Sequence, residues 1–238
     1  MDILGIIPAR GGSKGIPGKN VKQLGRKPLI QYTIEAALDS EYITDLVVST
    51  EDEEIAEISR GLNANVPSLR PLELATDESP TIDTVIYTLK LMMQKGKSYD
   101  LICLLQPTTP FRKKGFIDAA IKKYIMADAN SLISVLPVPH QYNPHWVFEP
   151  NEEDFLSLST GDSDIIPRRQ ELPRTFIRDG SIYLTSSKVL LEEKSLFGNC
   201  LTFIEADEKI HVNLDTMEDW GRAERIIKTN GVGVDKIL

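Results

Sequence analysis

The chain has 238 residues, of which 41% are hydrophobic and 26% are charged, and its formal net charge is -8 at pH 7. This length suffices for one large α/β domain with a full core, and we expect residues 1–238 to form a single domain. An acidic balance argues against a general nucleic-acid surface, which needs a broad basic stripe. The sequence has neither a signal-peptide pattern nor an apolar stretch near the roughly 20 residues of a membrane span, so we expect a cytoplasmic protein without a membrane partner.

Positive charge is nevertheless concentrated near the N-terminus. Between Ile3 and Ile34 the sequence carries six basic residues and no carboxylate. Residues 3–7 are typical of a buried strand, and the segment that follows is rich in glycine, where backbone N–H groups can approach phosphate oxygens closely. Neither a Walker A motif nor a Gly-x-Gly-x-x-Gly pattern occurs in this loop. The segment therefore predicts a polyanion site of another type at the carboxyl end of the first strand, where ligands bind in open α/β sheets.

Apolar runs then alternate with helical patterns along the chain. We expect strands at 3–7, 46–49, 101–105, 132–136, 182–184 and 201–204. We expect helices at 28–38, 51–62, 82–94, 115–127 and 217–228. Such alternation indicates crossover units and a parallel sheet. The acidic run 51–54 is interpreted as a charged first helical turn, and Cys103 and Cys200, both in apolar strand-like stretches, are expected to be buried and reduced.

The pattern breaks between residues 137 and 179. Prolines recur there, and an acidic stretch is followed by Arg168, Arg169, Arg174 and Arg178. The segment is too long for an ordinary connection and too apolar to be disordered, so we expect a functional or partner-binding insertion. Its arginines could grip the carboxylate of an acidic substrate or pair with acids across a subunit contact.

Two further segments carry polar side chains at strand ends. Residues 104–112 form a proline-rich turn in which Gln106 offers donors and an acceptor to a base or sugar. Near the C-terminus, alternation points Asn213 and Asp215 to the same side, and their oxygens could hold a hard cation such as Mg²⁺. Asp215 or Thr216 would serve equally well as a helix cap. The residues alone leave these alternatives open.

Together these segments resemble the acylneuraminate cytidylyltransferase family, which makes CMP-sialic acid and its CMP-legionaminate and CMP-pseudaminate relatives. The strongest element is segment 7–20, IPARGGSKGIPGKN, which is similar to the family's opening signature throughout. Further matches lie at residues 49–52, 70–77, 104–108, 168–173, 179–183 and 215–220. The resemblance covers nearly the whole chain.

The resemblance implies a Rossmann-like, mainly parallel sheet of the nucleotide-diphospho-sugar transferase type. It implies that CMP is transferred from CTP, with Mg²⁺, to the anomeric hydroxyl of a nine-carbon α-keto acid sugar, and that pyrophosphate is released. It also implies a homodimer in which residues 137–179 are the dimerisation segment. The catalytic residues that it implies are Arg10, Lys19 and Asp215. By position, the nucleotide site comprises Ala9, Arg10, Gly11, Ser13, Lys19, Asn20, Arg70, Thr81 and Gln106. The implied sugar pocket comprises Gln106, Gln141, Arg169 and Tyr183, and the implied metal site Asn213 and Asp215.

Two features depart from the family pattern. Asn213 stands where many members have an aspartate, although Mg²⁺ usually takes its other ligands from triphosphate and water. The stretch 139–145 lacks the basic residue expected for N-acetylneuraminate itself, which favours a bacterial relative of the legionaminate type. The alternatives are a 3-deoxy-manno-octulosonate cytidylyltransferase, another sugar nucleotidylyltransferase, or a non-catalytic nucleotide-binding regulator.

Overall fold

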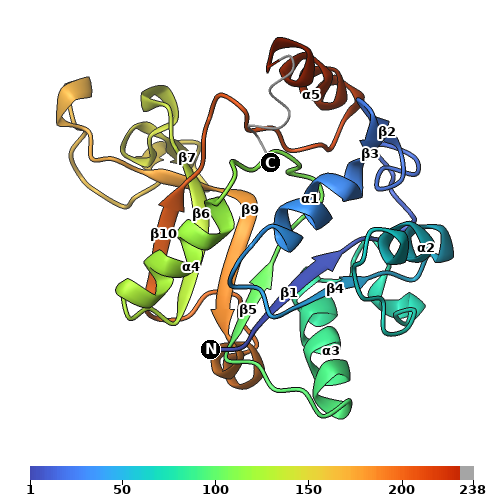
Figure 1. The fold of residues 1–238 in the computed structure, drawn as a ribbon. Coiled ribbons are helices and arrows are strands. Elements are labelled where there is room, and N and C mark those ends of the chain that lie inside the picture. Colours follow the sequence, from blue (N-terminus) through green and yellow to red (C-terminus); the bar gives the residue numbers. More distant parts are fainter. Residues whose placement is uncertain (231–238) are drawn as a thin grey trace.

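The structure, a computed structural model, describes residues 1–230 and is built around one six-stranded sheet (Figure 1). The strand order is β10-β6-β9-β5-β1-β4. The pairs β1–β4, β1–β5 and β10–β6 are parallel, whereas β9 runs antiparallel between β5 and β6. The strands are β1 (Ile3–Pro8), β4 (Asp45–Ser49), β5 (Leu101–Leu104), β6 (Ser131–Pro137), β9 (Phe176–Ser186) and β10 (Leu201–Glu205). The predicted mainly parallel sheet is confirmed, and the reversed direction of β9 is an addition to it.

Helices cover both faces of the sheet because β1 is apolar on both sides. Ile3 and Ile7 pack in one cluster with α1 (Leu29–Leu38), α2 (Glu53–Gly61) and α4 (Phe116–Met126). Leu4 and Ile6 point to the opposite face, where they pack against α3 (Thr81–Gln94) and the π-helical turn η5 (Val189–Glu193). The last helix, α5 (Met217–Asn230), packs beside the short hairpin of β2 (Gln23–Leu24) and β3 (Lys27–Pro28). Within residues 1–230, no helix combines the length and the apolar character needed to cross a membrane.

The predicted insertion is an elaborated hairpin loop between β6 and β9. Pro137 of β6 pairs with Phe176 of β9, so the segment leaves and re-enters the sheet at one point. This return to the neighbouring position makes β9 antiparallel. In Figure 1 the insertion projects from one end of the sheet. It contains a small hairpin of β7 (Phe148–Pro150) and β8 (Leu156–Leu158), and the single turns η2 (His140–Tyr142), η3 (Pro144–Trp146) and η4 (Arg169–Glu171).

The expectation of two buried cysteines is half wrong. Cys103 in β5 is fully buried, and burial raises the pKa of its thiol to about 12. Cys200 is exposed, because it comes just before β10, which lies at the edge of the sheet and is itself only partly covered. An apolar strand pattern indicates membership in the sheet, and it does not distinguish a central from an edge position.

Candidate active site

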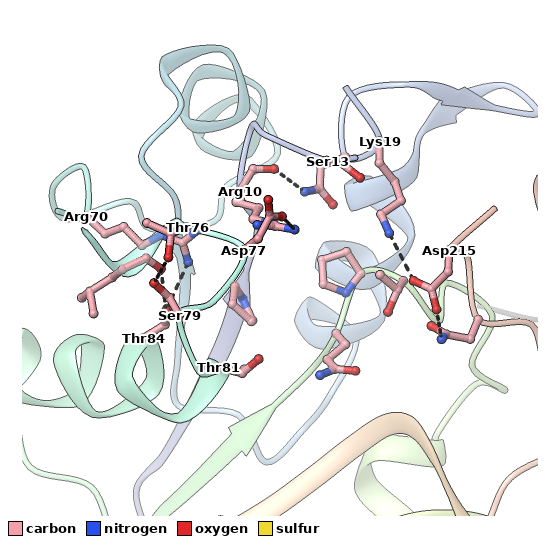
Figure 2. Close-up of a pocket in the computed structure, with 17 residues that line it drawn as sticks. Arg10, Ser13, Lys19, Arg70, Thr76, Asp77, Ser79, Thr81, Thr84 and Asp215 are labelled. Atoms are coloured by element: carbon pink, nitrogen blue, oxygen red, sulfur yellow. Dashed lines mark hydrogen bonds and ion pairs between the residues drawn. The ribbon is translucent and has the colours of Figure 1, made fainter. Parts of the chain in front are cut away.

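A cavity of about 380 Å³ opens where β1, β4 and β5 end (Figure 2). Its wall is formed by the glycine-rich loop after β1, by the segments that follow β4 and β5, and by residues 213 and 215 near the C-terminus. Seven of the nine residues predicted for the nucleotide line it: Arg10, Ser13, Lys19, Asn20, Arg70, Thr81 and Gln106. Ala9 and Gly11 lie outside the lining, since Ala9 is buried and the Gly11 N–H donates to Glu51 Oε1 at 2.7 Å.

The glycines of the loop allow close packing between protein segments. A Cβ at Gly15 would lie 2.1 Å from the carbonyl oxygen of Asp215, and one at Gly11 would lie 2.2 Å from Asp52 Oδ2. Asn20 closes the loop from within, because its Nδ2 donates to the Arg10 carbonyl at 2.9 Å. The sequence predicted that these glycines would bring backbone amides close to phosphate; at these two positions they bring the loop close to its neighbours.

Arg70 is a buried cation in the cavity wall. Its Nη2 donates to Glu51 Oε2 at 2.8 Å, and burial lowers the pKa of Arg70 although Glu51 opposes this effect. The Nε–H of Arg70 is also buried and has no hydrogen-bond partner among the described residues. Buried donors are normally paired, so this N–H is an exception in the cavity wall.

The interpretation of residues 51–54 as a first helical turn is wrong at its first two positions. Helix α2 begins at Glu53, and Asp52 is its N-cap, whose Oδ1 accepts from the Ile55 N–H at 3.0 Å. Glu51 lies before the cap and turns toward Arg70. A buried partner on a distant segment therefore decides the role of Glu51, and nothing in the local charge pattern reports such a partner.

Lys19 and Asp215 meet on the opposite side of the cavity. Lys19 Nζ donates to the Leu214 carbonyl at 2.6 Å and lies 3.6 Å from Asp215 Oδ1. Burial lowers the pKa of Lys19, and the charge of Asp215 opposes this shift. Asn213 Nδ2 donates to Asp215 Oδ2 at 2.6 Å, and the amide oxygen of Asn213 takes no part in this bond.

Thr216 and Asp219, and not Asp215, cap the last helix. The Asp219 N–H donates to Thr216 Oγ1 at 3.2 Å, while Asp219 Oδ2 accepts from the Thr216 N–H at 2.8 Å. This reciprocal pair is a capping box, so the caps of α5 are Thr216 and Asp219. The carboxylate of Asp215 stays at the cavity, with 64% of its side chain exposed.

The oxygens of Asn213 and Asp215 fit a magnesium ion that takes its remaining ligands elsewhere. Carboxylate and amide oxygens are hard donors of the kind Mg²⁺ selects. Among the residues that the structure describes, no group of three or more His, Cys, Asp or Glu side chains could hold a metal. A metal here would therefore depend on phosphate oxygens and water for most of its coordination.

A second cavity, of about 560 Å³, adjoins the first, and Thr81, Gln106 and Asn213 line both. Of the four residues predicted for the sugar, Gln106 and Tyr183 line it. Gln141 and Arg169, which lie in η2 and η4 of the insertion, line neither cavity.

An irregularity in β9 shapes this second cavity. Val135 pairs with Arg178 and Ile133 pairs with Tyr183, so β9 bulges outward between those two pairs. Gly180 in the bulge has φ +84°, and a Cβ there would lie 3.0 Å from Gln106 Oε1. Bulges commonly re-aim side chains beside active sites. This one places Arg178 and Tyr183 in the cavity wall.

The far wall of the second cavity follows the π-helical turn η5. Lys194, at the end of that turn, adopts φ +49°, and the residues after it continue along the wall. The Phe197 ring lies 6.1 Å from the Tyr183 ring in an edge-to-face arrangement. Nothing in the sequence points to Lys194 or Phe197, because the positive φ of a lysine has no signal in the residue types.

Arg112 connects the two strand ends that carry these cavities. Its Nη2 donates to the carbonyls of Gln106 at 2.9 Å and Ser181 at 2.8 Å, and its Nη1 donates to Thr33 Oγ1 at 3.1 Å. Complete burial lowers the pKa of Arg112 to about 10, although the charge of Asp179 opposes this. The guanidinium thus fixes the backbone at Gln106 against β9.

The fold is one that solved nucleotidyltransferases share. A solved CMP:2-keto-3-deoxy-manno-octonic acid synthetase, in complex with CTP, shares the fold, with a TM-score of 0.72 at 16% identity over 97% of this chain and 100% of that chain. A 4-diphosphocytidyl-2C-methyl-D-erythritol synthase from Anaerococcus prevotii gives a TM-score of 0.63 at 12% identity, covering 95% of this chain and 98% of that chain.

Similarity in sequence shows the family. The family model described as "Cytidylyltransferase" matches residues 4–198. A CMP-N,N'-diacetyllegionaminic acid synthase from Legionella pneumophila is 37% identical over 97% of this chain and 98% of its own length. A pseudaminic acid cytidylyltransferase from Campylobacter jejuni is 30% identical over 97% of this chain and 98% of its own. The chain belongs to the cytidylyltransferase family.

Proposed function

We propose that the chain transfers CMP from CTP to the anomeric hydroxyl of a nine-carbon α-keto acid sugar of the legionaminic acid type. The observation that carries this proposal is the pair of adjoining cavities, which meet at Gln106 and present cations to a triphosphate in one and to an acid in the other. The 37% identity to a relative named as a CMP-N,N'-diacetyllegionaminic acid synthase supports this choice among nine-carbon acceptors.

In the first cavity we place the triphosphate against Arg10, Ser13 and Lys19, and the nucleoside toward Arg70 and Gln106. Charged donors and phosphate oxygens form short, strong hydrogen bonds.

The reaction is an in-line displacement at the α-phosphorus. The anomeric oxygen forms the new P–O bond, the bond between the α-phosphorus and the pyrophosphate oxygen breaks, and the hydroxyl proton passes to Asp215. Lys19 and Arg10 neutralise the charge that develops on the departing pyrophosphate. A magnesium ion held by Asn213 and Asp215 would neutralise a further part of the negative charge on the phosphates.

In the second cavity we place the acceptor. Arg178 and Lys194 offer positive charge to its carboxylate, and the rings of Tyr183 and Phe197 offer an apolar wall to its acyl substituents. Asp179 does not compete for these cations, because its side chain is fully buried and accepts hydrogen bonds from Ser134 and Ser181.

We further propose that residues 137–179 pair two copies of the chain. Large apolar side chains of the insertion are exposed, including Phe155 and Leu156, each with 67% of its surface accessible. Pairing through this segment would cover them and would bring Arg169 and Gln141 to the acceptor cavity of the other copy. Sedimentation velocity at micromolar concentration should give a dimer, and a Phe155→Glu variant should shift the chain toward the monomer.

The test of the proposed function is a substrate panel. The protein is incubated with Mg²⁺, each of the four NTPs, and legionaminic, pseudaminic, N-acetylneuraminic or 3-deoxy-manno-octulosonic acid. Pyrophosphate release gives the rate and mass spectrometry identifies the product. We expect CTP and a nine-carbon acid to give the fastest turnover. A preference for the octulosonic acid, or CTP binding without any CMP-sugar, would favour one of the alternatives instead.

A further inference from the structure

Asp77 has no role in the proposed reaction, yet it lies among the phosphate-binding residues. It lies in the turn 76–79, and Figure 2 shows its carboxylate directly beside Arg10 at the cavity. Its Oδ1 lies 2.7 Å from Arg10 Nη2, and its Oδ2 lies 2.7 Å from Lys14 Nζ. The hydrogen bonds from Lys14 and Arg10 hold the pKa of Asp77 below its usual range, so the group is charged at neutral pH.

This carboxylate resembles a phosphate group in what it offers to the glycine-rich loop. It presents two anionic oxygens, and each accepts from a different basic side chain of that loop. We propose that Asp77 is an internal competitor for the triphosphate. It neutralises Arg10 and Lys14 in the free enzyme, is displaced when CTP binds, and returns as pyrophosphate leaves. This inference rests on the proposed function of the same cavity.

The turn that carries Asp77 keeps its shape without help from the glycine-rich loop. It is closed by its own hydrogen bonds, from Thr76 Oγ1 to Ser79 Oγ at 2.7 Å and from Ser79 Oγ to the Glu73 carbonyl at 2.5 Å. In the part of the chain that the structure describes, its polar contacts with the glycine-rich loop are the two ion pairs of Asp77. Releasing these pairs therefore frees the Asp77 carboxylate from the loop, while the bond to Glu73 still holds the turn in front of α3, which begins at Thr81.

The exposure of the ion pairs makes their displacement by a nucleotide easy. The Asp77 side chain is 37% exposed and that of Lys14 is 83% exposed. Ion pairs in such positions are weak because water screens them, whereas a triphosphate carries several charges to the same cations. The competition therefore lowers the affinity for anions without blocking the site.

Removal of the Asp77 carboxylate should change the affinity for anions in opposite directions, depending on whether Asp77 competes with the ligand or supports its binding. A carboxylate that only held Arg10 and Lys14 in position would weaken anion binding when removed. A competitor, once removed, leaves both cations free for the ligand and so tightens binding. The same change should slow the departure of pyrophosphate.

The test is calorimetric titration of Asp77→Asn with inorganic pyrophosphate, and separately with CTP, without any acceptor sugar. We expect both to bind about tenfold more tightly than to the wild type, since two exposed ion pairs no longer compete. The pyrophosphate inhibition constant in turnover should fall by a similar factor. Asp77→Glu, which keeps the charge, should stay close to the wild type.

Glu78→Gln is the matched control. Glu78 is exposed, is adjacent to Asp77, and forms no ion pair among the described residues, so this change removes the same charge from the same turn. We expect its affinities to stay within about twofold of the wild type. Unchanged or weaker pyrophosphate binding by Asp77→Asn, or equal tightening in Glu78→Gln, would overturn the proposal. Failure of the proposed function would look different: a wild type that binds both anions but makes no CMP-sugar.

Discussion

The replacement of Lys19 by methionine tests the assignment of the triphosphate most directly. Methionine keeps most of the apolar stem and removes the charge, which lies 2.6 Å from the Leu214 carbonyl and 3.6 Å from Asp215 Oδ1. Two unit charges about 4 Å apart interact by about 4 kcal/mol at an effective dielectric constant of about 20. Because Asp215 already neutralises part of the lysine charge, we expect a loss of about 2–3 kcal/mol, or roughly 30- to 150-fold in kcat/KM.

The assay for Lys19→Met is initial pyrophosphate release over a range of CTP concentrations at a saturating acceptor concentration. Loss of the bond to Leu214 also costs about 1 kcal/mol of stability, which lowers the Tm by about 2–4 °C for a chain of this size. Activity is therefore measured well below the transition. The matched control is Arg26→Met, which removes an exposed charge from the same basic segment outside the cavity lining. A Lys19→Met enzyme within about threefold of the wild type, or a loss equal to that of Arg26→Met, would refute the assignment.

Three further changes test other parts of the site. Asn213→Asp places a second carboxylate beside Asp215, so nucleotide-free protein should bind Mg²⁺ about tenfold more tightly in a calorimetric titration; an unchanged Kd would contradict the paired metal site. Gly15→Ala puts a Cβ 2.1 Å from the carbonyl oxygen of Asp215, so it should displace the loop and weaken CTP binding about tenfold. The control Gly12→Ala, whose Cβ would meet nothing within 4 Å, should bind CTP normally. Arg112→Met removes the buried donors to the Ser181 carbonyl and one of the donors to the Gln106 carbonyl, and should reduce the free energy of unfolding in urea by about 3 kcal/mol; a near-neutral effect would argue that the local backbone rearranges.

The sequence was sufficient to predict the parallel part of the sheet, because crossover units have a local signature of buried strand, loop and amphipathic helix. It was insufficient for β9. Only residues 182–184 were expected there, whereas the strand begins at Phe176 and runs antiparallel. Its direction follows from the pairing of Pro137 with Phe176 across the insertion, which is a long-range contact. A hydrophobic run specifies a strand but not the neighbour that fixes its direction.

In the candidate active site, too, the sequence showed local patterns and did not show long-range contacts. The loop from Arg10 to Asn20 was predicted because its charge and glycine content lie in one short stretch. The roles of Glu51 and Asp77 were missed because each is defined by a basic partner far away in the sequence. The contribution of Lys194 depends on the end of a π-helical turn. These are properties of tertiary packing, and the residue type alone does not report them.

The glycine-rich loop is completed by residues that follow the last strand of the sheet in the sequence. Lys19 donates to the Leu214 carbonyl, Gly15 packs against the backbone of Asp215, and the Leu214 N–H donates to the Thr108 carbonyl at 2.8 Å. All six strands of the sheet end by Glu205. A nascent chain on the ribosome can thus pair its whole sheet while its phosphate loop still lacks one wall. Completion of the proposed triphosphate site would then await the synthesis of residues 214 and 215, and a product terminated after Glu205 would carry the sheet without one wall of that site.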